Sequence, residues 1–222
     1  MTCTCKYKTP QGFDDMWMTS DGDVLTGLWF EGSRGLLKHR LDCAERDVPV
    51  FRETRRWLDI YFSGRQPDFI PRYRMDGLTP FRREVVDAMR AIPFGETATY
   101  GDIAAALAKK LGIAKMSAQA VGGAVGWNPI CIIIPCHRVI GADGSLTGYG
   151  GGLENKMALL AHEGFRAESA ERRDCQEVLQ LALGSILSEN RGCGRGIPAK
   201  EKTPGTFCSE SLLPANGGGR GI

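Results

Sequence analysis

The 222-residue sequence lacks the features that mark several large classes of protein. No apolar run reaches the roughly 18–20 residues that cross a bilayer, so we expect no membrane partner. No apolar signal core follows Met1, which favours a cytoplasmic chain over an exported one. The formal net charge is only +2, so overall charge does not by itself indicate a nucleic-acid binder.

Metal ligands and phosphate-binding loops are also scarce. The chain has 3 His and 8 Cys, and Cys3 and Cys5 are separated by a single residue with no second pair nearby. No Gly-rich phosphate loop and no catalytic pair of carboxylates is found. We therefore expect neither a metal nor another cofactor, and in the reducing cytosol we expect thiols rather than disulfides.

The most informative segment is Ile-Cys-Ile-Ile-Ile-Pro-Cys-His-Arg, over residues 130–138. The β-branched residues predict a fully buried strand over 130–134, which ends at Pro135 because proline cannot donate to a sheet. Cys136 and His137 follow directly, and a thiol presented beside an imidazole by a rigid strand is suited to nucleophilic attack. The alternative is that Cys136 is a buried structural thiol, since free cysteine packs as a small hydrophobe.

The residues before this segment predict three helices, over 80–91, 100–110 and 118–125. Each begins after a Ser or Thr suited to an N-cap: Thr79, Thr99 and Ser117. The last two helices, joined by a Gly-containing turn, form a candidate helix-turn-helix.

A pair of glycines, Gly122 and Gly123, lies inside the helix expected over 118–125, although glycine weakens helices. Such a pair permits close approach of another backbone. The approaching backbone is that of a neighbouring helix or of a DNA groove wall, and the sequence favours neither.

The first third of the chain has a different character. Residues 4–31 predict a small β region that contains a hairpin with strands at 16–19 and 24–30. A helix is expected over 49–62 and a linker over 64–78. At the other end, residues 168–189 can form a helix, and the Gly-, Pro- and Ser-rich remainder to residue 222 is expected to be disordered.

Nucleophilic attack by Cys136 requires a thiolate, and a free thiol with a pKa of about 8.5 is mostly protonated at neutral pH. Adjacent side chains of an extended segment point in opposite directions, so His137 is expected to reach Cys136 through a water molecule. Glu163 is a candidate to orient His137, although, without further information, a solvated carboxylate at a helix end explains it better. Together with a helix-turn-helix, this thiol indicates action on a base that has been extruded from the DNA stack.

Five motifs occur in one order: residues 95–100 (Gly-Glu-Thr-Ala-Thr-Tyr), 120–124 (Ala-Val-Gly-Gly-Ala), 128–129 (Asn-Pro), 134–139 (Ile-Pro-Cys-His-Arg-Val) and 159–164 (Leu-Leu-Ala-His-Glu-Gly). This order resembles the O6-alkylguanine-DNA alkyltransferases, or methylated-DNA–protein-cysteine methyltransferases. The resemblance is strong over residues 79–166 and weaker over 4–78.

The resemblance implies an α/β fold with an RNase-H-like N-terminal domain over residues 1–78. A mostly α-helical, winged-helix-like domain over residues 79–166 would follow and contain the helix-turn-helix and the active site. Residues 167–222 form an extension that the family does not explain.

The implied reaction is DNA repair by irreversible transfer of the alkyl group of O6-alkylguanine, and also of O4-alkylthymine, to the protein's own cysteine. Each molecule then acts once, because the thioether is too stable to reverse. The implied partner is double-stranded DNA carrying the lesion, bound by a monomer.

The resemblance also implies roles for individual residues. The implied catalytic residues are Cys136, His137, Glu163, Asn128 and Tyr100. The implied substrate-binding residues are Tyr149, Lys156, Val139 and Trp127. The implied DNA-binding residues are Gln119, Ala118, Gly122, Gly123, Arg138, Ala142, Gly101 and Arg82.

One departure from the family pattern concerns Gln119, where the family commonly has an arginine that fills the gap left by the flipped base. Glutamine is shorter and uncharged, so we expect weaker or slower flipping. Cys131, five residues before Cys136, is interpreted as a packing residue and not as a second acceptor.

Three other functions fit parts of the sequence. A non-catalytic binder of alkylated DNA would lack the acceptor thiol, so Cys136 argues against it. A redox-sensing helix-turn-helix regulator would need base-reading side chains, which a helix with two glycines offers in small number. A thiol hydrolase is supported only by the Cys and His.

Overall fold

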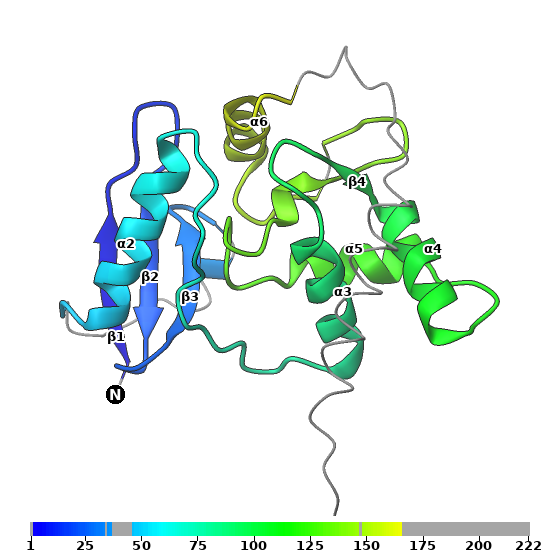
Figure 1. Ribbon diagram of the computed structural model, residues 1–222, viewed down its shortest axis with the longest axis horizontal. Coiled ribbons are helices and arrows are strands. Elements are labelled where there is room, and N and C mark those ends of the chain that lie inside the picture. Colours follow the sequence, from blue (N-terminus) through cyan, green and yellow to red (C-terminus); the bar gives the residue numbers. More distant parts are fainter. Residues whose placement is uncertain (1, 34, 37–45, 147, 166–222) are drawn as a thin grey trace, which may run out of the picture.

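The computed structural model describes residues 2–33, 35–36, 46–146 and 148–165. Its helices and strands form an N-terminal group and a C-terminal group, which are connected by residues 63–79 (Figure 1). The helix and the disordered segment expected after residue 167 lie outside the described residues. No helix in the described part of the chain is long and apolar enough to cross a membrane.

The N-terminal group is a three-stranded antiparallel sheet in the order β1-β2-β3, covered on one face by a helix (Figure 1). The strands are β1 (Cys3–Tyr7), β2 (Met16–Ser20) and β3 (Leu25–Phe30), and the helix is α2 (Pro49–Phe62). Met16 pairs with Phe30 across β2 and β3, and both side chains are fully buried. The expected hairpin and the helix over 49–62 are confirmed.

The C-terminal group contains the three expected helices packed on one another: α3 (Pro80–Arg90), α4 (Tyr100–Leu111) and α5 (Ala118–Gly126). Their predicted N-caps are confirmed, because the hydroxyls of Thr79, Thr99 and Ser117 each accept a hydrogen bond from a backbone N–H three residues on. Gly112 ends α4 with φ +65°, a conformation that favours glycine.

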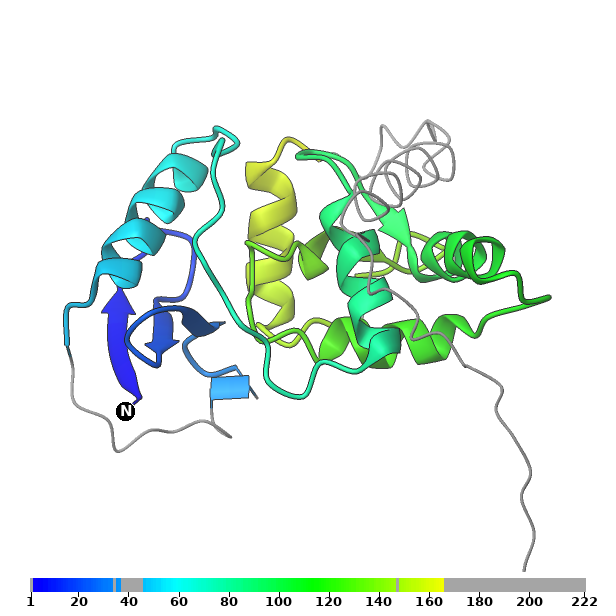
Figure 2. The same ribbon diagram turned by 60° about the horizontal axis from the view of Figure 1, so that its bottom comes forward.

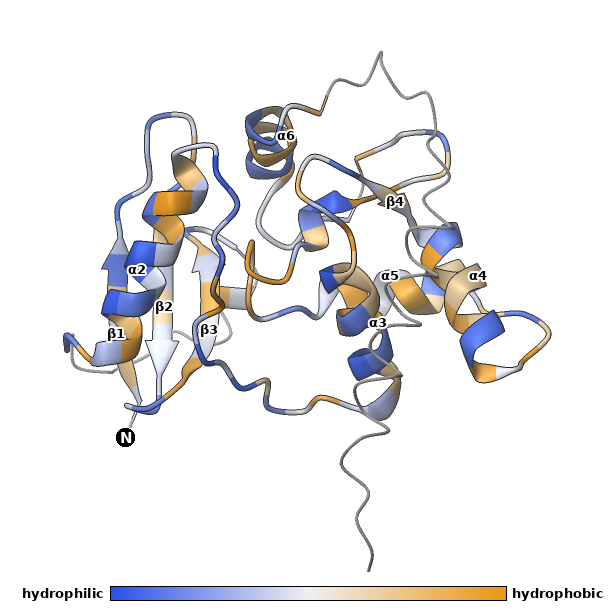
Figure 3. Cartoon of the chain, viewed as in Figure 1, coloured by the Kyte–Doolittle hydropathy of each residue, from blue (hydrophilic) through white to orange (hydrophobic). Residues whose placement is uncertain are grey.

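Short elements complete this group. Strand β4 (Ala98–Thr99) pairs in parallel with β5 (Val139–Ile140), and the 3-10 helix η1 (Cys136–Arg138) directly precedes β5. Helix α6 (Leu153–His162) lies between the N-terminal group and the other helices (Figure 2). Polar and apolar residues alternate around α2 and α3, as expected for helices with one buried face (Figure 3).

The strand expected over residues 130–134 is wrong. These residues are buried, but the structure forms a tight turn in which the Ile134 N–H donates to the Ile130 carbonyl at 3.0 Å. Ile132 adopts φ +67°, which a β-branched residue rarely does. A run of apolar β-branched residues indicates burial, and here tertiary contacts override the preference for extended backbone.

Strand β3 holds this turn in place. The Leu28 N–H donates to the Pro129 carbonyl at 2.8 Å, and the Cys131 N–H donates to the Leu28 carbonyl at 2.9 Å. A second connection joins the loop before β2 to α6, where the Asn155 amide donates to the Asp14 carboxylate at 2.8 Å. The N-terminal sheet therefore supports the segment that leads to Cys136.

Candidate active site

Asn128 organises the turn that precedes Cys136. Its Nδ2 group donates to the carbonyls of Ile130 at 3.3 Å and Ile134 at 2.9 Å, and its Oδ1 accepts from the Ile130 N–H at 3.0 Å. The same Nδ2 lies 3.1 Å from the Cys136 Sγ. The Asn128 amide therefore holds this turn together and also contacts the sulfur.

The Cys136 thiol lies at the wall of a cleft of about 1140 Å³ between the two groups of elements. The side chain is 5% exposed. Trp127, Tyr149 and the glycine-rich segment 148–152 line the same cleft. The thiol is therefore sheltered but in contact with a space large enough for a small ligand.

The surroundings of Cys136 favour its ionised form. A hydrogen bond from the Cys131 thiol lowers the pKa of Cys136, against burial, which raises it. The Asn128 amide and the positive charge of Lys156 lower this pKa further. The net pKa lies below the ordinary value of a cysteine, so more thiolate is present near neutral pH.

His137 and Glu163 form a buried pair beside the thiol. The His137 Nε2 lies 2.8 Å from the Glu163 Oε1, and both side chains are completely buried. Burial lowers the pKa of His137 although the carboxylate opposes this effect. A neutral imidazole that faces a carboxylate carries its proton on Nε2, because an ionised carboxylate only accepts.

The other nitrogen of His137, Nδ1, is buried and has no hydrogen-bond partner among the described residues. No direct hydrogen bond therefore joins His137 to Cys136 in this part of the chain, in agreement with the expectation from the sequence. Nδ1 is left as a proton acceptor. The alternative reading of Glu163 as a solvated helix end is excluded by its burial.

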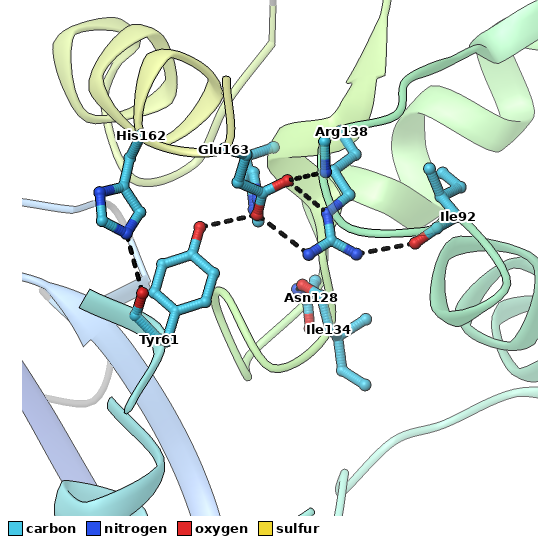
Figure 4. A network of polar contacts seen from close by, with 9 residues as sticks. Tyr61, Ile92, Asn128, Ile134, Arg138, His162 and Glu163 are labelled. Carbon is cyan, nitrogen blue, oxygen red and sulfur yellow. Dashed lines mark hydrogen bonds and ion pairs between the residues drawn. The ribbon is translucent and has the colours of Figure 1, made fainter. Parts of the chain in front are cut away.

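The Glu163 carboxylate is the centre of a larger polar network (Figure 4). Arg138 donates to it from Nε and Nη2 at 2.8 and 2.9 Å, Tyr61 from its hydroxyl at 2.7 Å, and Gly95 from its N–H at 3.1 Å. Burial alone would raise the pKa of Glu163, but the hydrogen bonds and charges of His137 and Arg138 bring it well below its usual range.

Arg138 does not lie where the sequence predicted it. Its guanidinium is buried, binds Glu163 and donates from Nη1 to the Ile92 carbonyl at 2.7 Å. This position contradicts its expected place on the DNA-binding surface. The buried Glu163 carboxylate requires a charged partner, and Arg138, next to His137, supplies it.

Two of the expected substrate-binding residues lie behind the cleft wall. Lys156 is completely buried, and its Nζ donates to the Val139 carbonyl at 2.6 Å. Burial lowers the pKa of Lys156 to about 8, against the opposing charge of Cys136. Val139 is likewise fully buried, in β5. Lys156 therefore lies in the interior of the protein, although the family resemblance implied that it binds substrate.

The remaining predicted residues lie nearer the surface. Tyr100, at the first position of α4, is half-buried, and burial raises its pKa. The Arg82 guanidinium stacks over the Trp127 ring at 4.3 Å from its centroid. Exposed positions are occupied by Gly101, Ala118, Gln119, Gly123 and Ala142.

The glycine pair in α5 has two different surroundings. A Cβ on Gly122 would lie 3.8 Å from the Tyr100 ring, which is ordinary contact with the neighbouring helix. A Cβ on Gly123 would meet nothing within 4 Å. A Cβ at position 122 would therefore fit against the neighbouring helix, and Gly123 faces open space.

Tyr61 was not among the residues that sequence patterns indicated for the site. It lies near the end of α2, its ring stacks on Trp57, and its hydroxyl reaches Glu163 from the N-terminal group. Nothing in the local sequence distinguishes this tyrosine from other aromatic residues on a buried helix face. Cys131, interpreted from the sequence as a packing residue, is buried and lines the same cleft as Cys136.

Comparison with known proteins fits this geometry. Residues 80–165 match the family described as 6-O-methylguanine DNA methyltransferase, DNA binding domain. A methylated-DNA–protein-cysteine methyltransferase of Methanosarcina acetivorans is 50% identical over 114 residues, or 51% of this chain and 69% of that protein. The corresponding protein of Haemophilus influenzae is 40% identical over 162 residues, or 71% of this chain and 83% of its own length.

This chain belongs to the methylated-DNA–protein-cysteine methyltransferases. Solved structures agree with that membership. The crystal structure of Mycobacterium tuberculosis O6-methylguanine methyltransferase has a TM-score of 0.61 at 38% identity, covering 73% of this chain and 93% of that one. A structure of Mycobacterium tuberculosis OGT in complex with DNA has a TM-score of 0.59 at 36% identity, covering 80% and 98%.

No group of three or more His, Cys, Asp or Glu side chains in the described ranges is arranged to hold a metal ion. The candidate site contains the Cys136 thiol beside the Asn128 amide, and the His137 imidazole beside the Glu163 carboxylate.

Proposed function

We propose that this protein repairs DNA by transferring the alkyl group of O6-alkylguanine to the sulfur of Cys136. The observation that carries the proposal is the position of that sulfur. It lies at the wall of the cleft, 3.1 Å from the Asn128 amide, in surroundings that lower its pKa. A thiolate held in this way is a nucleophile suited to an alkyl carbon.

His137 and Glu163 would generate the thiolate. The Nε2–H of His137 donates to Glu163, so Nδ1 can accept the Cys136 proton through one bridging water molecule. The ionised carboxylate then stabilises the imidazolium that forms. Arg138 and Tyr61 keep that carboxylate ionised and oriented.

The thiolate would attack the alkyl carbon, forming a C–S bond while the bond between that carbon and O6 breaks. The electron pair leaves with the purine, and Tyr100 at the start of α4 would donate a hydrogen bond as charge develops there. Tyr149 and Trp127 would wall the pocket. The products are restored guanine and S-alkylcysteine, so each molecule acts once.

Recognition of DNA would use the exposed surface around α5. Gln119, Ala118 and Gly123 are exposed on this helix, and small residues permit close approach to a minor groove. Gly101, Gly122, Ala142 and Arg82 would complete the surface. The finer organisation that we propose is an RNase-H-like domain over residues 1–78 and a winged-helix-like domain over 79–166.

Intact-mass spectrometry after incubation with a methylated oligonucleotide tests the proposal. We expect a gain of one methyl group, about 14 Da, mapped to Cys136, because the thiolate is the acceptor. Cys136→Ala is the control and should gain nothing. Binding without mass gain would indicate a lesion binder, and binding to one DNA sequence irrespective of alkylation would indicate a regulator.

Three further properties are proposed with this function. O4-alkylthymine is a second substrate, the protein works as a monomer, and it acts in the cytoplasm. Substrate range is checked by the same mass measurement with an O4-methylthymine oligonucleotide. Oligomeric state is checked by sedimentation with and without DNA.

A further inference from the structure

Cys131 is a second buried thiol beside the acceptor. It lies in the turn that Asn128 organises, and its side chain is 4% exposed. Both residues line the same cleft, and a side-chain hydrogen bond with Cys136 is the main cause that raises the pKa of Cys131. The proposed proton relay makes no use of Cys131.

The backbone fixes Cys131 from two sides. Its N–H donates to the Leu28 carbonyl of β3 at 2.9 Å, and its carbonyl accepts from the Ile133 N–H at 2.8 Å. The Cys136 N–H in turn donates to the Ile134 carbonyl at 2.8 Å. These hydrogen bonds fix the backbone at both cysteines, which line the same cleft.

We propose that Cys131 is a positioning residue for the alkyl transfer, whose S–H donates to the Cys136 sulfur and stabilises it as a thiolate. The proposal rests on the function proposed above. Cys131 keeps its proton throughout, while the Cys136 proton goes to His137. A thioether is a poorer hydrogen-bond acceptor than a thiolate, so this contact is strongest before the C–S bond forms.

The charges around the pair support this division of roles. The contact with Cys136 raises the pKa of Cys131 well above its ordinary value, and burial raises it further. The Asn128 amide lies 3.1 Å from the Cys136 sulfur as a second donor, so Cys136 is the thiol stabilised as a thiolate and Cys131 is the one that stays protonated. The other groups that face Cys136 are the Asn128 amide, the Lys156 ammonium and the hydroxyls of Tyr100 and Tyr149.

Two variants of the full chain, Cys131→Ala and Cys131→Ser, test the proposal. Serine retains a donor at the same position and alanine removes it. Cys3→Ala is a matched control, because Cys3 is an equally buried thiol in β1, outside the residues that line the cleft. The rate of Cys136 labelling by iodoacetamide is followed against pH by peptide mass spectrometry, and methyl transfer from an oligonucleotide is followed in parallel.

We expect Cys131→Ala to move the midpoint of the labelling profile to higher pH. Both rates at pH 7 should fall by about tenfold, as for the loss of a hydrogen bond to a charged group. Cys131→Ser and Cys3→Ala should keep the profile of the unsubstituted chain. A midpoint that Cys131→Ala leaves in place would overturn the proposal, as would an equal loss of rate at every pH in both Cys131 variants, since packing alone would then explain it.

Failure of the function itself gives a different result. If the unsubstituted chain accepts no methyl group from the oligonucleotide but Cys131→Ala still shifts the labelling profile, the repair reaction is overturned and the thiol contact is supported. If a variant does not fold, infrared spectroscopy of the unsubstituted chain tests the proposal instead. There the S–H band of Cys131 should move to higher frequency when Cys136 is alkylated, and an unmoved band would overturn the proposal.

Discussion

The Tyr61 hydroxyl donates to the Glu163 Oε1 at 2.7 Å, although the two residues are 102 positions apart in the chain. Tyr61 belongs to α2 of the N-terminal group, and Glu163 directly follows α6 (Figure 4). The carboxylate that orients His137 is thus held in part by the other group of elements. The N-terminal group therefore contributes to the site as well as supporting the turn before Cys136.

Tyr61→Phe should lower both stability and the rate of alkyl transfer. The ring still packs on Trp57, but a buried carboxylate loses one donor, which costs about 1–3 kcal/mol of unfolding free energy. We expect the transfer rate to fall several-fold, because Glu163 is less firmly held. Urea unfolding and single-turnover transfer measure the two effects.

Tyr7→Phe is the matched control for this change. The Tyr7 hydroxyl donates to the Asp59 carboxylate at 2.8 Å, away from the cleft. Its loss should lower stability without changing the transfer rate. Equal rates for Tyr61→Phe and the unsubstituted chain would contradict a role of Tyr61 in orienting Glu163.

Glu163→Gln should destabilise the protein by about 3–5 kcal/mol at pH 7, since it leaves Arg138 buried without its charged partner. The folded-state pKa of Glu163 lies well below its unfolded value. The carboxylate therefore contributes its full stabilisation above the unfolded pKa of about 4.3, and this contribution is lost as pH falls toward the folded pKa.

Denaturant unfolding at several pH values checks the direction of this pH dependence of stability. The stability difference between Glu163→Gln and the unsubstituted chain should be constant from pH 7 to about pH 5 and should shrink on further acidification. A difference that grows on acidification would contradict the ionised state of Glu163. Glu154→Gln, on the exposed face of α6, is the control and should show no such trend.

Gly123→Leu should weaken binding to DNA while leaving the protein folded. No protein atom lies within 4 Å of a Cβ at this position, and replacing glycine inside a helix stabilises it by up to about 1 kcal/mol. The bulky leucine side chain would nevertheless prevent the wall of a DNA groove from approaching α5. Thermal unfolding and DNA titration measure the two effects, and labelling of Cys136 by iodoacetamide should be unchanged.

Gly123→Ala gives a graded comparison, with a smaller loss of DNA affinity than leucine. Unchanged affinity in both variants would place the DNA elsewhere on the molecule. Such a result would not contradict the reaction proposed for Cys136.

Gln119→Arg should increase base flipping. Gln119 is exposed on the first turn of α5, where a longer charged side chain could fill the gap left by an extruded base. Fluorescence of a base analogue opposite or beside the lesion should rise more, or faster, on binding the variant. Equal flipping by the two proteins would refute the expectation.

The sequence by itself determined the parts of this protein that depend on near neighbours. The starts of α3, α4 and α5 follow from a hydroxyl that binds a backbone N–H three residues later, and such contacts are complete within the segment. The motif around Cys136 and His137 likewise indicated the candidate nucleophile without any tertiary information.

Only the tertiary structure decided the features that depend on distant residues. Residues 130–134 form a turn with Ile132 at positive φ, because β3 and the Asn128 amide take the hydrogen bonds that a strand would use. Arg138 turns inward because Glu163 is buried beside it, and Tyr61 reaches the same carboxylate from the other group of elements. The contact between Cys131 and Cys136 follows from that turn, since a strand would carry the two sulfurs apart.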